Sequence, residues 1–336
     1  MIDNRDITVV VQGPVQALPD RDQDEGITQL CLRSVRELLP GARIILSTWD
    51  QQDLDGLDYD ELVINADPGP NVIGYWKNGE PRKENYNRQI VSTVGGLRRV
   101  QSKYAMKLRA DNFLTGDQFK ALQTRFRKRG ADCRFSRERV VVNNTFTRLF
   151  SKGLHVAFHN CDFFYFGLSE DVLDMWDLPL FEDYKFDPAR QGLVQHHGAP
   201  FHNVDVCQEL WLRYLNKHLA EPIELRHLHD FDAALSLISD QSFANNLVIG
   251  APEDIGLGLP SKFGRGTRAT RPSRLMAYVS HQDWQRLYQR DCDPQFAVED
   301  TLKGNLRVAF WRYVYMPLRG LSERLALAKK KRRLRD

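Results

Sequence analysis

The sequence predicts an α/β fold of the Rossmann type, with a mostly parallel sheet and helices on both of its faces. Two observations support this prediction. Apolar runs typical of buried strands alternate with segments of helical periodicity in the order strand, helix, strand, strand, helix, strand. Each run also ends in polar or turn-forming residues. Because ligands in such sheets lie beyond the carboxyl ends of the strands, these polar residues become the candidate site.

The amino-terminal third supplies the elements of the predicted sheet. The predicted strands cover residues 7–11, 43–48, 61–65 and 104–109. The predicted helices cover residues 28–39, with Pro40 and Gly41 ending the first, and residues 84–101.

The second half of the chain is less regular. An apolar run at residues 163–167 precedes a helix at 170–176, and a second helix covers 205–218. Residues 261–274 are rich in Gly, Arg and Thr without periodicity, so we expect an exposed or mobile loop there.

Length and composition fit a globular protein, because 336 residues with 42% hydrophobic and 27% charged residues can bury a large core. No apolar stretch of about 18 residues and no signal-peptide pattern occurs, so we expect a cytoplasmic protein. The five cysteines form no CxxC pair, which favours free thiols over a disulfide framework or a thiolate zinc site. A net charge of +3 is too small to predict a nucleic-acid partner.

Polar residues at the strand ends should meet at one edge of the sheet. They are Gln12, Asp50, Asp67, Arg109 and Asp111. Gly13 and Pro14 follow the first strand, where a residue without a Cβ lets backbone approach a nucleotide; an ordinary turn is the alternative. Lys107 and Arg109 alternate on one strand and therefore point to the same side. Two cations there are costly unless an anion or a carboxylate such as Asp111 meets them.

Six blocks of the sequence resemble the WavE family of lipopolysaccharide-synthesis proteins. They are residues 7–14, 44–49, 85–93, 107–112 (Lys-Leu-Arg-Ala-Asp-Asn), 163–172 and 208–212, so the resemblance spans roughly residues 5–230. It implies a GT-A-like fold with a nucleotide-sugar-binding α/β part at 1–125. An acceptor-binding or catalytic part of the same domain would follow at 126–260, and a loop with a basic, aromatic C-terminal helical tail at 261–336.

The resemblance predicts a glycosyltransferase that moves a sugar from a nucleotide-sugar donor to a bacterial surface polysaccharide or lipopolysaccharide acceptor. Two alternatives stay open. A nucleotidyl or sugar-phosphate transferase would use the same diphosphate-binding edge, and a non-catalytic partner in a glycan-assembly complex would not need it.

Donor binding in GT-A enzymes uses a carboxylate motif from which this sequence departs. The usual motif is Asp-x-Asp, which holds a divalent metal against the diphosphate, but this chain has Arg109-Ala110-Asp111. Asp111 alone can still ligate Mg²⁺ or Mn²⁺ if phosphates and waters complete the shell. Alternatively, Arg109 with Lys107 or Arg88 could neutralise the diphosphate directly. The donor-binding candidates are Gln12, Gly13, Pro14, Asp50, Asn87, Arg88, Lys107, Arg109, Asp111 and Asn112.

Transfer with inversion also needs a base for the acceptor hydroxyl, and the candidates are Asp162, Asp205 and Glu209. A turn residue is the alternative for Asp162, and an interaction with the helix dipole is the alternative for Glu209. The late histidines do not have zinc-site spacing, although one could complete the coordination of a substrate-bound metal. These are His196, His197, His202, His227 and His229.

The carboxyl end combines aromatic and basic residues. Residues 306–316 predict an amphipathic helix, and residues 328–335 (Ala-Lys-Lys-Lys-Arg-Arg-Leu-Arg) are rich in Lys and Arg. Such a segment can lie on an anionic inner-membrane surface, which suits an enzyme with a lipid-linked glycan acceptor. A core-packing helix with a charged tail is the alternative.

Overall fold

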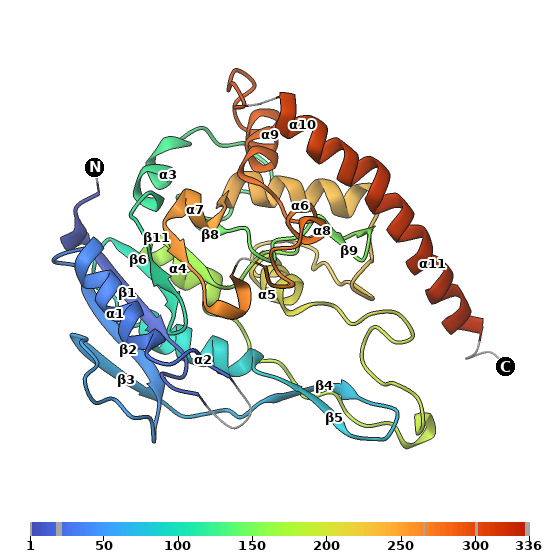
Figure 1. Cartoon of the computed structure of the whole chain (residues 1–336), viewed down its shortest axis with the longest axis horizontal. Coiled ribbons are helices and arrows are strands. Elements are labelled where there is room, and N and C mark those ends of the chain that lie inside the picture. The colour runs from blue at the N-terminus through green and yellow to red at the C-terminus, as the bar shows by residue number, and fades with distance from the viewer. Residues whose placement is uncertain (1, 18–21, 265, 300–301, 333–336) are drawn as a thin grey trace.

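The computed structural model describes residues 2–17, 22–264, 266–299 and 302–332 and contains a central mixed sheet (Figure 1). In the described residues its strands lie in the order β12-β8-β11-β6-β1-β2-β3. All run parallel to one another except β11, which is antiparallel to both of its neighbours. The bounds are β1 Ile7–Gln12, β2 Arg43–Trp49, β3 Glu61–Asn65, β6 Tyr104–Arg109, β8 Val140–Asn143, β11 Phe164–Leu168 and β12 Leu247–Gly250.

The predicted α/β fold with a mostly parallel sheet is confirmed. Every residue of β1 is buried, as expected for a strand covered on both faces, and β6 is buried except for Arg109 at its end. The four predicted amino-terminal strands agree with β1, β2, β3 and β6 to within one residue.

The principal helices pack against both faces of this sheet. The chain crosses from β1 through α1 (Ile27–Leu38) to β2 in one direction, and from β3 through α2 (Tyr86–Leu97) to β6 in the opposite direction. Because such crossovers are right-handed, α1 and α2 lie on opposite faces. Helix α4 (Ser169–Trp176) packs beside α2, and α5 (Val206–Asn216) packs on α4.

A hairpin precedes α2 that the sequence analysis did not predict. Strands β4 (Asn71–Tyr75) and β5 (Pro81–Glu84) pair antiparallel, so the predicted start of a helix at residue 84 was wrong. The turn contains Asn78-Gly79, and Gly79 has φ +85°. This dipeptide is a strong hairpin signal that its polar surroundings concealed.

Shorter elements complete the second half. The helices are α3 Phe119–Arg125, α6 Ala233–Asn246, α7 Pro252–Ile255, α8 Pro272–Leu275 and α9 His281–Asp291. The short strands are β7 Phe113–Leu114, β9 Phe150–Ser151, β10 Leu154–His155 and β13 Leu257–Gly258. The 3-10 turns are η1 Asn4–Asp6, η2 Pro188–Arg190 and η3 Ser261–Phe263.

The carboxyl end is one long helical segment along the side of the molecule (Figure 1). It comprises α10 (Leu302–Ala309), the π-helical turn η4 (Phe310–Tyr315) and α11 (Met316–Arg332), and is longer than the predicted 306–316. The predicted basic run begins within α11, and its residues 333–335 lie outside the described residues. No helix in the described ranges is both long and apolar enough to span a bilayer.

Helix α2 approaches the sheet closely through Gly96. A Cβ there would fall inside van der Waals contact of Val10 Cγ1 and lie 3.0 Å from Ser47 Cβ. Alanine normally stabilises a helix interior by about 1 kcal/mol relative to glycine. We predict that Gly96→Ala instead lowers the free energy of unfolding by about 1–3 kcal/mol, because it overpacks the interface. Urea unfolding measures the change.

The double variant Val10→Ala with Gly96→Ala is the control, since it removes the side chain that the new Cβ meets. Gly96→Ala should lower the free energy of unfolding less in the Val10→Ala protein than in the parent. A Gly96→Ala protein more stable than the parent would contradict this account of the α2 interface.

Candidate functional site

A cavity of about 710 Å³ opens at the carboxyl ends of β1, β2 and β6, a size that suits a small-molecule ligand. Eight predicted site residues line it: Gln12, Gly13, Pro14, Asp50, Arg88, Arg109, Asp162 and Asp205. The other lining residues are Trp49, Gln51, Gln52, Asp67, Glu84, Asn85, Tyr86, Gln89, Ser92, Phe146, Arg148, Phe163, Val206, Cys207 and Phe263. We call this space the sheet-edge cavity.

The turn after β1 forms part of the cavity wall. Gly13 has φ +107° and donates its N–H to the Ser47 carbonyl at 3.1 Å, so this turn needs a residue without a Cβ. Gln12 Oε1 accepts a hydrogen bond from Ser92 Oγ of α2 at 2.7 Å. Two non-glycine residues in the wall, Gln51 and Phe146, also have positive φ values of 59° and 71°. Such conformations concentrate at functional sites because they need the surrounding structure to hold them.

Arg109 places a fixed cation in this wall. Its Nε and Nη2 donate to the two oxygens of Asp111, each at 2.8 Å, and its Nη1 lies 4.0 Å from Asp162 Oδ2. The guanidinium also stacks over Phe163 at 4.7 Å. Burial disfavours the charge, but the Asp111 carboxylate outweighs it and raises the pKa of Arg109. The guanidinium therefore stays charged and oriented.

Two further arginines line the cavity, each with a carboxylate. Arg88 Nη2 lies 2.6 Å from Asp67 Oδ2, and this hydrogen bond lowers the pKa of Asp67. Arg148 Nη1 lies 3.4 Å from Asp205 Oδ2 and 3.1 Å from His159 Nε2. The cavity thus has three guanidinium groups that an anionic ligand could meet.

Asp162 lies between the cations of β6. Gln89 donates to its carboxylate, and the Lys107 ammonium donates to its backbone carbonyl. Cys207 Sγ lies 3.9 Å from the other carboxylate oxygen. The side chain retains 10% exposure and lines the cavity, so its carboxylate can reach a ligand there.

Asp205 has a structural role at the start of α5. Its side chain accepts from the Cys207 N–H in a capping box, and its other contacts are His159 and Arg148. Burial alone would raise its pKa, but His159, Arg148 and the Cys207 N–H together lower it. An ionised carboxylate held in this way is a weak proton acceptor.

Five predicted site residues do not line the cavity. Asn87 exchanges two hydrogen bonds with the Phe181 backbone, at 2.9 and 2.7 Å. Asn112 is buried and donates to Asp111 Oδ1 at 3.1 Å in the amide orientation that satisfies both groups. The remaining three are Lys107, Asp111 and Glu209.

Lys107 and Glu209 lie outside the cavity wall, each in a different environment. Lys107 is completely buried, with its ammonium 4.4 Å from the Trp176 ring centroid, and burial lowers its pKa to about 7. Glu209 lies in the first turn of α5, where burial raises its pKa against the opposing charge of Arg213.

The carboxylates do not fit a magnesium or manganese ion. The two oxygens of Asp111 face Arg109, and Lys262 Nζ lies 3.4 Å from one of them. His159, Asp205 and Cys207 place possible ligand atoms within 4.8 Å of one another. However, burial raises the pKa of the Cys207 thiol, and Arg148 already contacts the other two residues. Mg²⁺ and Mn²⁺ prefer oxygen ligands.

The late histidines lie elsewhere. None of the described cavity-lining residues is a histidine, and His202 Nε2 instead contacts Glu323 of α11 at 2.7 Å. His229 Nε2 contacts the Ser151 carbonyl at 3.1 Å.

An aromatic wall was not predicted. Phe146 contacts Phe163 and Phe263 at ring-centroid distances of 5.7 and 5.3 Å. Phe263 belongs to the segment predicted as a loop, whose first turn is tied down by Ser261 hydrogen bonds of 2.6 and 2.7 Å to Asp24. Arg148 was also missed, because it follows an irregular stretch without periodicity. A loop aromatic or arginine carries no sequence signal that separates it from surface residues.

The family comparison covers nearly the whole chain. The family described as WavE lipopolysaccharide synthesis matches residues 7–317. The chain belongs to the WavE lipopolysaccharide synthesis family. The predicted resemblance is confirmed, and it extends beyond the predicted limit near residue 230 to the start of α11.

Solved structures similar to this WavE protein have low sequence identity to it. The 4-diphosphocytidyl-2C-methyl-D-erythritol synthase from Anaerococcus prevotii is 13% identical, with TM-score 0.31, over 56% of this chain and 83% of that chain. HddC from Yersinia pseudotuberculosis is 12% identical, with TM-score 0.29, over 54% and 83%. TarS from S. aureus is 7% identical, with TM-score 0.33, over 91% and 47%. No curated protein matches the sequence.

The buried Lys107 makes the stability of this WavE protein depend on pH. Its folded pKa of about 7 lies below its ordinary value of 10.5, so the unfolded chain binds more protons between these two values. We predict that the parent gains stability relative to Lys107→Met as pH rises from 7 to 10. Urea unfolding of both proteins at several pH values measures the difference. A difference that stays constant across this range would contradict the lowered pKa.

Proposed function

We propose that this WavE protein is a GT-A-like glycosyltransferase. It transfers a sugar from a nucleotide-sugar donor to a bacterial surface polysaccharide or lipopolysaccharide acceptor. Family membership supports the role in lipopolysaccharide synthesis. The supporting observation in the site is the juxtaposition of Arg109 and Asp162 in one cavity, with 4.0 Å between Nη1 and Oδ2.

The proposed donor site uses the amino-terminal part of the cavity. Gly13 gives the nucleotide close access to backbone, and Asp50 accepts hydrogen bonds from its base or ribose. Arg109 and Arg88 contact the diphosphate, and their carboxylate partners keep both guanidinium forks oriented. Residues 1–125 thus form the donor part, while 126–260 contribute Phe146, Asp162 and Arg148 on the acceptor side.

The proposed reaction is a single displacement at the anomeric carbon. An acceptor hydroxyl oxygen forms the new glycosidic bond while the bond from that carbon to the diphosphate oxygen breaks. The electron pair of the broken bond leaves with the diphosphate, whose charge Arg109 stabilises. Asp162 takes the hydroxyl proton as general base. We choose Asp162 over Asp205 because the latter is held by the α5 cap and by His159.

The proposed chemistry uses protein cations in place of a resident metal. Where an Asp-x-Asp motif would hold a divalent ion, this chain has Arg109 bound to Asp111 through both oxygens. A guanidinium fork matches phosphate oxygens and can neutralise them directly. Mg²⁺ or Mn²⁺ would then reach the site only with the donor phosphates.

The C-terminal helical segment supports a position at the inner surface of the cytoplasmic membrane. Large apolar side chains remain exposed along it, including Phe310, Leu318 and Leu325 at 57%, 66% and 65%. Exposed basic residues of α11 accompany them, and they attract anionic lipid headgroups. The opposite side is anchored to the protein, because Met316 is buried and Arg312 pairs with Asp283 at 2.6 Å. A lipid-linked glycan acceptor would be reached there.

Donor binding is tested with a thermal-shift panel of UDP-, GDP-, CMP- and dTDP-sugars, with Mn²⁺ or with EDTA. We predict that one donor raises the melting temperature, because a ligand bound only to the folded state adds stability by mass action. The shift should persist in EDTA. No shift with any donor would favour a non-catalytic partner, and a shift lost in EDTA would overturn the metal-independent site.

Two substitutions separate binding from chemistry. Arg109→Lys keeps a charge beside Asp111 but loses the fork, so donor affinity should fall at least about tenfold. Asp162→Asn should retain donor binding while release of nucleoside diphosphate falls about 10²–10⁴-fold. Arg33→Gln on the exposed side of α1 is the matched control and should change neither. Equal donor affinity in Arg109→Lys and the parent would exclude Arg109 from the donor site.

Membrane contact is tested by co-sedimentation with phosphatidylglycerol and phosphatidylcholine vesicles. We predict binding to the anionic vesicles that falls with salt, because screening weakens the attraction of exposed cations. The double variant Leu318→Ser with Leu325→Ser should bind less, whereas Leu237→Ser on α6 should not. Equal binding to both vesicle types would argue against this surface.

A further inference from the structure

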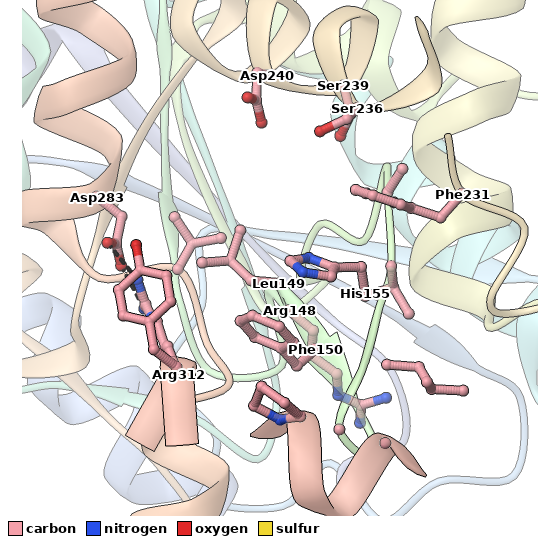
Figure 2. A pocket seen from close by; sticks show the side chains of 18 of the residues that line it. Arg148, Leu149, Phe150, His155, Phe231, Ser236, Ser239, Asp240, Asp283 and Arg312 are labelled. Carbon is pink, nitrogen blue, oxygen red and sulfur yellow. Dashed lines mark hydrogen bonds and ion pairs between the residues drawn. The ribbon is translucent and has the colours of Figure 1, made fainter. Parts of the chain in front are cut away.

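A second cavity of about 690 Å³ lies beneath the C-terminal helical segment, between η4, α11, α6 and residues 148–157. Figure 2 shows Ser236, Ser239 and Asp240 of α6 facing Leu149 and His155 across this space. Most of its wall is apolar. We call it the helix cavity.

Flat rings form one side of the helix cavity. His155 stacks on Phe231 with 4.9 Å between ring centroids and an interplanar angle of 20°, and lies 4.3 Å from the Phe150 ring. Burial, and secondarily the charge of Arg324, lowers the pKa of His155. The ring is therefore neutral at pH 7, and this wall favours an apolar chain.

The charged residues of the wall are mainly cations. Four arginines line the cavity, compared with two aspartates. Asp283 is neutralised by Arg312, with two hydrogen bonds of 2.6 and 2.7 Å that Figure 2 shows as dashed lines. Asp240 pairs with Arg290 at 3.1 Å. Arg148 and Arg286 also have carboxylate neighbours, at 3.4 Å from Asp205 and 3.5 Å from Asp283. The cationic surplus of this wall therefore lies at Arg324, which makes no ion pair within the described residues, and it favours an anionic group on the ligand.

Arg148 joins the two cavities, since its side chain lines both of them. Only 14% of this side chain is exposed. Its Nε is buried and donates no hydrogen bond within the described residues, although Nη1 contacts Asp205 and His159. A buried donor without an acceptor is costly, so a ligand oxygen at this junction would satisfy it.

The mouth of the helix cavity lies on the surface proposed to contact the membrane. Tyr313 and Leu321 line the cavity, yet they are 80% and 57% exposed. They belong to the same helical segment as the exposed Phe310, Leu318 and Leu325. An apolar chain that enters the cavity from a membrane would therefore meet exposed apolar side chains of this segment.

We propose that the helix cavity binds the apolar chain of the lipid-linked acceptor, with the acceptor phosphate at Arg148. The glycan end of such an acceptor would extend from Arg148 into the sheet-edge cavity, toward Asp162. The identity of the ligand as an acceptor rests on the proposed glycosyltransferase function. The two cavities would then divide the substrates, with donor and acceptor meeting at Arg148.

The test uses decyl phosphate below its micelle-forming concentration as the probe, with decanol and inorganic phosphate for comparison. Calorimetry should show that decyl phosphate binds the full chain at least about tenfold more tightly than either of the others. Ser236→Trp, which fills the cavity from α6, should weaken decyl phosphate binding about tenfold or more. Leu237→Trp is the matched control, because Leu237 is 49% exposed and does not line the cavity.

Arg148→Gln should reduce the preference for decyl phosphate over decanol without abolishing decanol binding. Unchanged probe binding in Ser236→Trp, or equal binding of dihexanoyl phosphatidylglycerol and decyl phosphate, would overturn the acceptor-chain assignment. Nucleotide-sugar shifts measured on the same variants separate the two proposals. If a donor binds and decyl phosphate does not, only the cavity assignment fails; if decyl phosphate binds and no donor does, the glycosyltransferase proposal fails.

Discussion

Two cations on one side of β6 constrain the rest of the structure. Lys107 is completely buried beside Trp176 of α4, and the Arg109 side chain is only 19% exposed at the end of the strand, so each charge requires oxygen partners. Lys107 donates a hydrogen bond to the Asp162 backbone carbonyl, and Arg109 donates to the Asp111 carboxylate. The Lys107 bond holds the chain that immediately precedes β11 against β6, which places Asp162 at the sheet edge. The cost of burying charge thus positions the proposed base.

The same pairing explains how the cavity can be cationic and still ordered. Arg88, Arg109 and Arg148 each lie against a carboxylate, so the free protein does not leave a buried charge unpaired. A diphosphate would add to these pairs, because a guanidinium has five donors and a single carboxylate uses only some of them. A metal ion at Asp111 would instead have to displace both Arg109 and Lys262. Ligand capture by existing cations therefore needs less rearrangement than metal capture.

The sheet was predictable because apolar residues dominate β1 and β2 and recur in β3 and β6, a pattern that is local in the sequence. The edge residues followed from topology, which explains why Gln12, Asp50 and Arg109 reached one cavity. Contacts between residues far apart in the sequence were not predictable. Asn87 binds the Phe181 backbone, and Phe263 and Arg148 reach the cavity from irregular segments, all through contacts that no periodicity encodes. For these residues tertiary packing, and not local propensity, determines the position.

The C-terminal helical segment packs against the part of the chain that carries Arg148. Residues 148–157 contribute to the wall of the helix cavity. Within them, Gly153 packs closely on α11, because a Cβ added at Gly320 would lie 2.6 Å from the Gly153 carbonyl oxygen. Arg312 and Glu323 add ion pairs to Asp283 and Lys152 on either side of this contact. The loop that carries Arg148 thus packs directly against α11. Because Arg148 also borders the sheet-edge cavity, one short segment connects the packing of α11 with the proposed acceptor side.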